Sequence, residues 1–150
     1  MKIQKTSNIQ NVELLSKLIF FNFFELQNEK NIEFSQDSII EILKKQSNIT
    51  WFLFDDLNQL CGYLIGYIDR LDDGRLVYYI AYFYITDYYR NQGYGRKMLL
   101  ICFKEIKELN IKFVMVISNK SNTFYRKFGF SNDPLLKINN ENYEILLSYM

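Results

Sequence analysis

The stretch Arg90-Asn91-Gln92-Gly93-Tyr94-Gly95 separates a long aromatic segment, residues 76–86, from a segment of helical periodicity that begins near Gly95. Glycine tolerates the positive φ angles of tight turns, so Gly93 and Gly95 let the backbone bend sharply and approach a ligand closely. The first N–H groups of a helix have no partner within it and carry the positive end of the helix dipole. The stretch therefore predicts an anion-binding turn between a strand and a helix.

Basic residues surround this turn. Arg90 can add a forked cationic contact to a phosphate group. Arg96 and Lys97 fall in the first helical turn, where a bare helix prefers Asp or Glu. Their presence favours a multiply charged anion at the site, although a plain glycine loop beside a solvated basic face also fits the pattern.

The elements on either side of the turn follow from periodicity. Apolar residues at three- and four-residue spacing predict helices over residues 8–27, 35–46 and 95–109, and a short helix over 121–128 that Gly129 ends. Aromatic and β-branched runs predict strands over residues 1–5, 50–55, 60–71, 76–86, 112–118, 135–138 and 143–149. Turn chemistry between the second, third and fourth of these strands predicts an antiparallel meander. Because one helix joins 76–86 to 112–118, those strands should be parallel, with the turn at a carboxyl end of the sheet.

Length and composition indicate a single folded domain. The chain has 150 residues, of which 49% are hydrophobic and 23% are charged. Its net charge of +1, from 18 basic and 17 acidic residues, provides no general field for nucleic acid or an anionic membrane. No apolar segment reaches the length of a membrane span and no signal-peptide core follows residues 1–5, so we expect a cytoplasmic protein.

The chain contains no histidine, which argues against a conventional zinc site or a Ser-His-Asp triad. Cys61 and Cys102 lie in apolar segments, without ligand-like spacing and without an evident activating cation. We expect them to be reduced core residues rather than nucleophiles, and we expect no metal. Any proton transfer must then use a carboxylate, tyrosine, cysteine, lysine or water.

The order strand, Arg-x-x-Gly-x-Gly, helix, strand, followed by Phe124-Tyr125-Arg126-Lys127-Phe128-Gly129-Phe130, resembles the GNAT superfamily of acyl-CoA N-acyltransferases over nearly the whole chain. The resemblance implies the GNAT α/β (α+β) fold, a mixed sheet of about seven strands with about four helices, splayed between the fourth and fifth strands. It also implies an N-acetyltransferase that transfers the acetyl group of acetyl-CoA to a primary amine by direct attack, without a covalent intermediate. A non-catalytic acyl-CoA-binding module or sensor is the alternative.

The resemblance also implies where the cofactor would lie. The end of segment 76–86 would pair with the pantetheine arm, and the Ile85 N–H would stabilise the oxyanion. Tyr125 would lie beside the sulfur as general acid. Asn119 is one position out of register with the amide residue of the family, and Asn122 competes for that role. The predicted cofactor-binding residues are Phe83, Tyr84, Ile85, Arg90, Asn91, Gln92, Gly93, Tyr94, Gly95, Arg96, Asn119 and Tyr125.

The acceptor site is less defined. Tyr79 occupies the position at which some members carry a basic Glu, so the amine proton would leave through water and tyrosines. Family substrates enter over residues 25–34 and 139–143. Here Glu25, Glu29 and Glu33 could attract a cation or could simply form the solvated side of a helix end, while Phe20, Phe24, Tyr78 and Tyr82 could line an aromatic pocket or the core. The sequence does not choose among a small amine, an aminoglycoside, a polyamine, an amino acid and a peptide N-terminus as the acceptor. It allows a homodimer but does not establish one.

Overall fold

The computed structural model describes residues 1–6, 19 and 36–150, and a seven-stranded sheet in the order β1-β2-β3-β4-β5-β7-β6 organises them. The first four strands form the predicted antiparallel meander, β4 pairs with β5 in parallel, and β7 lies antiparallel between β5 and β6. The mixed sheet and the parallel pairing confirm the predicted fold class. The strand bounds are β1 (Lys2–Thr6), β2 (Asn48–Phe54), β3 (Leu60–Arg70), β4 (Leu76–Ile85), β5 (Phe113–Asn119), β6 (Ser131–Asn132) and β7 (Tyr143–Tyr149).

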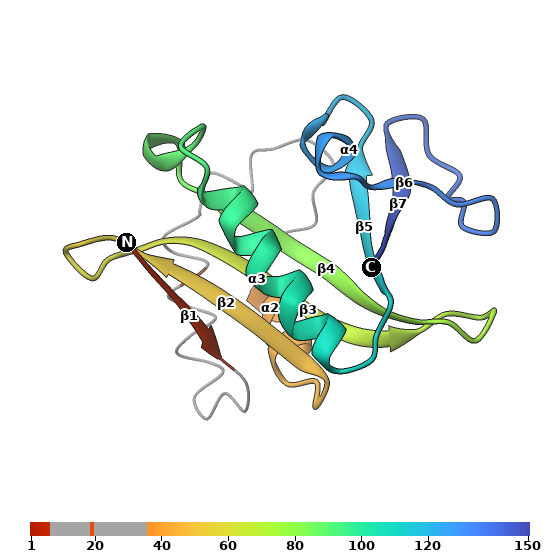
Figure 1. Cartoon of the computed structure of the whole chain (residues 1–150), viewed down its shortest axis with the longest axis horizontal. Coiled ribbons are helices and arrows are strands. Elements are labelled where there is room, and N and C mark those ends of the chain that lie inside the picture. The colour runs from red at the N-terminus through yellow and green to blue at the C-terminus, as the bar shows by residue number, and fades with distance from the viewer. Residues whose placement is uncertain (7–18, 20–35) are drawn as a thin grey trace.

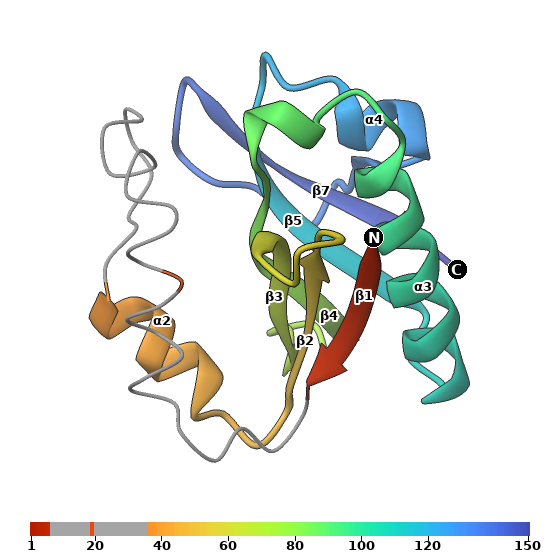
Figure 2. The ribbon, with the colours of Figure 1, turned by 90° about the vertical axis from the view of Figure 1, so that its left-hand side faces the viewer.

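Helices cover both faces of the sheet. Figure 2 shows α2 (Gln36–Leu43) on one face and α3 (Tyr94–Glu108) on the other. The apolar stripe of α3 is buried, as its periodicity predicts. The short α4 (Phe124–Phe128) follows β5. The predicted helix at 8–27 lies outside the described residues except for Ile19, which is buried. None of the helices in the described ranges has the length and apolar character needed to cross a membrane.

The predicted strand at 135–138 is wrong, and the strand that pairs with β7 is the shorter β6. The Asp133 side chain accepts a hydrogen bond from the Leu135 N–H at 2.9 Å, and the Asp133 carbonyl accepts from the Leu136 N–H at 3.1 Å. Pro134 has no N–H to donate to a neighbouring strand. Together these features make a turn where the alternation of apolar residues indicated a strand.

The last helix is also shorter than predicted. Asn122 accepts a hydrogen bond from the Phe124 N–H at 3.0 Å through its side chain. This local contact holds the segment before α4 as a turn, because an Asn side chain competes with the helical hydrogen-bond pattern. The helix consequently begins at Phe124 and ends at Phe128, and Gly129, whose φ of 117° suits glycine, caps it.

A bulge in β4 lies at the point where β4 separates from β5. Ile65 pairs with Tyr82, whereas the next residue of β3, Gly66, pairs with Ile80, so Ala81 is the extra residue. Parallel pairing between β4 and β5 ends at Ile80 and Val116, although both strands continue. Figure 1 shows the two ribbons diverging toward their carboxyl ends. The predicted splay is confirmed, and bulges of this kind bend and twist a strand.

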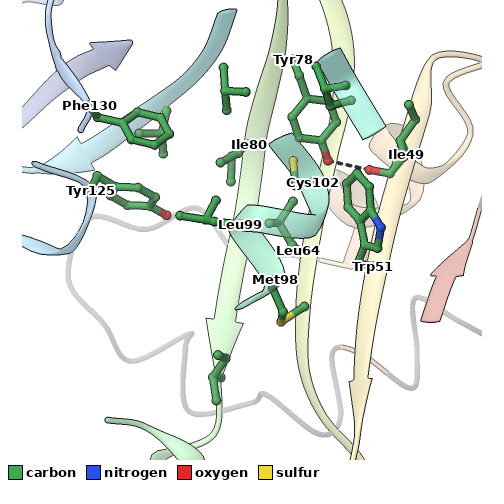
Figure 3. Packing of buried hydrophobic residues seen from close by; sticks show 14 of the residues in the cluster. Ile49, Trp51, Leu64, Tyr78, Ile80, Met98, Leu99, Cys102, Tyr125 and Phe130 are labelled. Carbon is green, nitrogen blue, oxygen red and sulfur yellow. Dashed lines mark hydrogen bonds between the residues drawn. The ribbon is translucent and has the colours of Figure 1, made fainter. Parts of the chain in front are cut away.

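Tyr78 links the strands of the meander beneath α3. Its hydroxyl donates a hydrogen bond to the Ile49 carbonyl at 2.5 Å, a contact drawn in Figure 3. The ring passes over Gly66, where an added Cβ would lie 2.5 Å from the Tyr78 ring and too close to the Tyr79 carbonyl. Asn48 donates to the Gly66 carbonyl at 3.2 Å. Side chains therefore satisfy backbone groups beside the bulge, and the position opposite it admits only glycine.

Candidate active site

A cavity of about 1080 Å³ lies between the carboxyl ends of β4 and β5. Its walls are the second half of β4, the end of β5, the start of α3, α4 and the segment between β6 and β7. The structure thus brings together residues that are far apart in the sequence. The predicted site residues that line it are Tyr79, Phe83, Tyr84, Ile85, Arg90, Asn91, Gly93, Tyr94, Gly95, Arg96, Asn119 and Tyr125.

The turn before α3 presents free backbone donors. Asn91 and Gly93 adopt left-handed conformations with φ of 61° and 86°, and Gly93 caps α3 without a side-chain hydrogen bond. No carbonyl or side chain of the described residues accepts from the N–H groups of residues 91–96, and the first helical bond runs from the Lys97 N–H to the Gly93 carbonyl at 3.1 Å. These donors and the positive end of the helix dipole can hold an anion.

Gln92 and Gly95 have supporting places in the turn. Gln92 does not line the cavity, and its side chain donates to the Tyr88 carbonyl at 2.8 Å. An added Cβ on Gly95 would lie 3.4 Å from the Phe124 ring and 3.5 Å from the Ile85 side chain. Gly95 therefore lets the start of α3 pack closely on both β4 and α4.

The end of β4 has a backbone edge with which no strand of the described residues pairs beyond Ile80. The Thr86 N–H donates to the Cys61 carbonyl at 2.9 Å, so Thr86 faces β3. Because residues alternate in direction along an antiparallel pair, the register places the N–H and carbonyl of Phe83 and Ile85 on the opposite side. That side is the cavity. An extended ligand can therefore pair with this edge as a neighbouring strand would.

The Arg90 side chain lies against the same strand end. Its Nε donates to the Ile85 carbonyl at 2.7 Å, and its guanidinium carbon lies 4.7 Å from the centre of the Tyr84 ring. A terminal nitrogen forms an ion pair with Asp87 at 2.5 Å. Arg90 borders the cavity, but it is already engaged by the protein.

Tyr125 is held on α4 by aromatic neighbours. Its ring centre lies 5.4 Å from those of Phe124 and Phe130 and 6.4 Å from that of Phe83; Figure 3 shows Tyr125 beside Phe130. The hydroxyl makes no hydrogen bond with any described residue, while the side chain lines the cavity. Burial, with a smaller effect from Tyr79, raises the pKa of Tyr125 above its ordinary value. The phenol therefore remains a proton-bearing donor at neutral pH.

Tyr79 lines the cavity and begins a row of two phenols with Tyr67. It pairs across the strands with Tyr67, and the ring centres are 5.5 Å apart with the edge of one ring on the face of the other. Burial, followed by the effects of Tyr67 and Tyr82, raises the pKa of Tyr79 to about 12. The Lys45 ammonium lies 4.7 Å from the Tyr67 ring centre. At neutral pH Tyr79 is protonated, so it can relay a proton but cannot act as a general base in its ionised form.

Asn119 and Asn122 both line the cavity. The Asn119 side-chain oxygen accepts from the Ser121 N–H at 2.9 Å and from its hydroxyl at 2.7 Å. Both asparagines thus use their side-chain oxygens in the turn before α4, which leaves the amide nitrogens for a ligand. Ser118, Asn140 and Tyr143 also line the cavity. Asn140 and Tyr143 belong to the segment 139–143 that the resemblance placed at the substrate entrance, whereas no sequence motif marks Ser118, which the pairing of β5 with β7 brings here.

Of the remaining candidates, Tyr82 also lines the cavity. Glu25, Glu29, Glu33, Phe20 and Phe24 lie outside the described residues, and Tyr78 belongs to the core. Cys61 and Cys102 are free and buried, as predicted. Burial raises the pKa of Cys61 to about 11, with a smaller effect from Asp55, and burial also raises that of Cys102. Neither thiol is poised to form a thiolate nucleophile.

Comparisons with known proteins agree with this geometry. The family model described as "Acetyltransferase (GNAT) family" matches residues 13–130. The chain therefore belongs to the GNAT acetyltransferase family. No curated protein sequence matches it.

Solved structures share the fold at low sequence identity. The NatC complex bound to Gag peptide and CoA contains a chain with a TM-score of 0.73 and 17% identity, over 100% of this chain and 99% of that one. Arabidopsis thaliana NAA60 in complex with a bisubstrate analogue has a TM-score of 0.68 and 13% identity, over 99% of this chain and 98% of that one. A predicted acetyltransferase from Clostridium acetobutylicum with acetyl-CoA has a TM-score of 0.70 and 19% identity, over 93% of this chain and 95% of that one.

Proposed function

We propose that this chain is an N-acetyltransferase that transfers the acetyl group of acetyl-CoA to a primary amine by direct attack. The observation that carries the proposal is one cavity that connects the open start of α3, the unpaired edge of β4 and the Tyr125 hydroxyl. An anion site, a strand-like binding edge and a proton donor then lie in the order that an acyl-CoA thioester presents its diphosphate, its pantetheine amides and its sulfur.

The residues of the site fit this cofactor. The N–H groups of residues 91–96 and the Arg96 guanidinium would hold the diphosphate, because they are free in a site that faces the cavity. The exposed edge at Phe83 would pair with an amide of the pantetheine arm. When bound, acetyl-CoA supplies the activated acetyl group.

The chemical step needs a group to stabilise negative charge and a route for a proton. The Ile85 N–H would donate to the oxygen that becomes negative when the amine nitrogen attacks the thioester carbon. Tyr125 would donate to the sulfur as the carbon–sulfur bond breaks. The pKa of Tyr125 is raised, whereas a thiol ordinarily titrates near 8.5. Tyr125 would therefore stabilise the leaving thiolate by a hydrogen bond more than by full proton transfer. The thiolate would then take its proton from water.

The amine would enter from the side of the cavity that Tyr79 and Tyr82 line. Its excess proton would leave through water and the row from Tyr79 to Tyr67, which ends near charged residues of α2 and β3. Peptide N-termini and small amines are both candidate acceptors. Similar chains in complex with a peptide and with a bisubstrate analogue support the peptide class.

A thiol-release assay tests the proposal. The protein is incubated with acetyl-CoA and a panel of peptide N-termini, arylalkylamines, polyamines and aminoglycosides, and free CoA thiol is followed with time. We expect release that depends on at least one amine, together with an acetylated product. Saturable acetyl-CoA binding without amine-dependent release across the panel would instead indicate an acyl-CoA sensor.

A further inference from the structure

Arg90 and Arg96 both border the cavity beside the open helix start, but their surroundings differ. Arg90 contacts the Ile85 carbonyl, Asp87 and the Tyr84 ring. The Arg96 guanidinium lies 5.5 Å from the Phe128 ring centre and makes no ion pair or hydrogen bond with a described residue. The Arg96 guanidinium can therefore contact a bound anion directly, whereas Arg90 would first have to break its contacts with Ile85 and Asp87.

The contact of Arg90 with Ile85 completes a clamp on one peptide unit. The carbonyl of the Ile85–Thr86 peptide accepts from Arg90, and the N–H of the same peptide donates to the Cys61 carbonyl at 2.9 Å. Since both polar atoms are held, the peptide plane cannot rotate freely. The clamp lies next to the Ile85 N–H, the donor that faces the cavity.

The Tyr84 ring supports the Arg90 guanidinium, whose central carbon lies over it at 4.7 Å from the ring centre. Tyr84 is buried, so its ring provides a rigid support, and a guanidinium is better suited than an ammonium to lie flat on a ring while donating a directed hydrogen bond. The Asp87 carboxylate is 85% exposed, so this ion pair is screened by solvent and adds little to the clamp.

We propose that Arg90 is a positioning residue for acyl transfer, which holds the Ile85–Thr86 peptide so that the neighbouring Ile85 N–H keeps its direction, and that the diphosphate is bound by the α3 N–H groups and Arg96 instead. This inference rests on the proposed function. It assigns the first residue of the Arg-x-x-Gly-x-Gly stretch to the chemical step and not to cofactor affinity.

Arg90→Gln, Arg90→Lys and Arg96→Gln separate the two roles, with Lys107→Gln at the far end of α3 as a control of equal charge change. CoA affinity is measured by calorimetry at two salt concentrations, and kcat and KM are measured with the best amine of the panel. Circular dichroism establishes that each variant is folded. If Arg90→Gln does not fold, Arg90→Lys provides the comparison.

For Arg90→Gln we expect kcat to fall by about tenfold, with the Kd for CoA within about threefold of the wild-type value and an unchanged salt dependence. Arg90→Lys restores the charge but not kcat, since lysine cannot reproduce the forked, stacked geometry. Arg96→Gln raises the Kd by about tenfold and weakens its salt dependence. Lys107→Gln changes neither quantity.

A Kd and salt dependence for Arg90→Gln that match those of Arg96→Gln would overturn the proposal, because Arg90 would then be a phosphate ligand. Recovery of kcat by Arg90→Lys would overturn it as well. Absence of CoA binding by the wild-type protein is a different result, which would reject the proposed function itself.

Discussion

Tyr125 shows how one residue acquires a chemical role from its surroundings. Rings of Phe83, Phe124 and Phe130 fix the phenol, while its oxygen lacks a described partner and its side chain borders the cavity. A hydroxyl at the wall of a cavity can complete its hydrogen bonding with a ligand or water that enters. The residue is therefore organised to donate to something that enters the cavity.

Replacing Tyr125 by Phe removes this donor and keeps the ring. We expect kcat to fall by about 10- to 100-fold, because hydrogen bonding to the leaving sulfur is lost in the transition state. The Kd for acetyl-CoA, measured by calorimetry, should change little. Tyr149→Phe, at an exposed position of β7, is the control and should retain full turnover.

The pH dependence gives a second readout for Tyr125. Its raised pKa means that the phenol keeps its proton through the neutral and mildly alkaline range. The kcat of the wild-type protein should accordingly show no decline from Tyr125 deprotonation below about pH 10, the ordinary pKa of tyrosine. A wild-type decline that disappears in Tyr125→Phe would contradict this assignment.

At the scale of single elements, the start of α3 is the best-defined feature. Left-handed residues at Asn91 and Gly93 turn the chain so that consecutive N–H groups remain free. The absence of an acidic residue in the first turn leaves the dipole of a 15-residue helix without its usual compensation. An anion bound here would be stabilised by the helix dipole and would in turn stabilise the helix.

Gly93→Glu and Gly74→Glu form a matched pair. Both glycines have positive φ, 86° and 91°, and neither has an atom within 4 Å of an added Cβ. Each change should therefore cost about 1–2 kcal/mol of folding free energy from left-handed strain, but only Gly93→Glu brings negative charge to the turn. We expect its CoA affinity, measured by calorimetry, to fall on the order of 100-fold or more, and that of Gly74→Glu to be unchanged.

A folded Gly93→Glu variant that binds CoA as tightly as the wild-type protein would mean that the turn does not hold the diphosphate. A similar loss in both would point to an indirect effect of strain instead. Urea unfolding of each variant without ligand supplies the comparison of stability.

At the scale of the whole molecule, the site depends on how the sheet is held open. The bulge at Ala81 and the end of pairing at Ile80 turn β4 away, while β7 keeps β5 in place. Tyr78 reaches from β4 across Gly66 of β3 to the Ile49 carbonyl of β2. The core on the α3 face thus fixes the first half of β4, and the second half of the same strand forms a wall of the cavity.

Gly66→Ala should disturb this arrangement strongly. The added Cβ would overlap the Tyr79 carbonyl and lie 2.5 Å from the Tyr78 ring, so either the sheet or the ring must move. We expect the free energy of unfolding, measured with urea, to fall by about 3 kcal/mol or more. Gly74→Ala, which meets no atom within 4 Å, should cost only about 1–2 kcal/mol from its positive φ; equal losses would contradict the steric account.

Much of this organisation was predictable because it depends on nearby residues. Helical spacing at 95–109, turn residues between the strands of the meander, the stop at Gly129 and the glycine turn are local signals, and the structure reproduces each within a residue or so. The strand predicted at 135–138 failed for a local reason too, since the Asp133 turn outweighs the apolar alternation that follows it.

The sequence by itself determined the order of the elements, the parallel crossover and the free N–H groups before α3, because these follow from steric limits and hydrogen bonding within a few residues. Only the tertiary structure decided that β4 and β5 stop pairing at Ile80, that Arg90 is bound to Ile85, and that burial raises the pKa of Tyr79 and Tyr125. Those properties arise from contacts and solvent exclusion between segments distant along the chain, which no local pattern encodes.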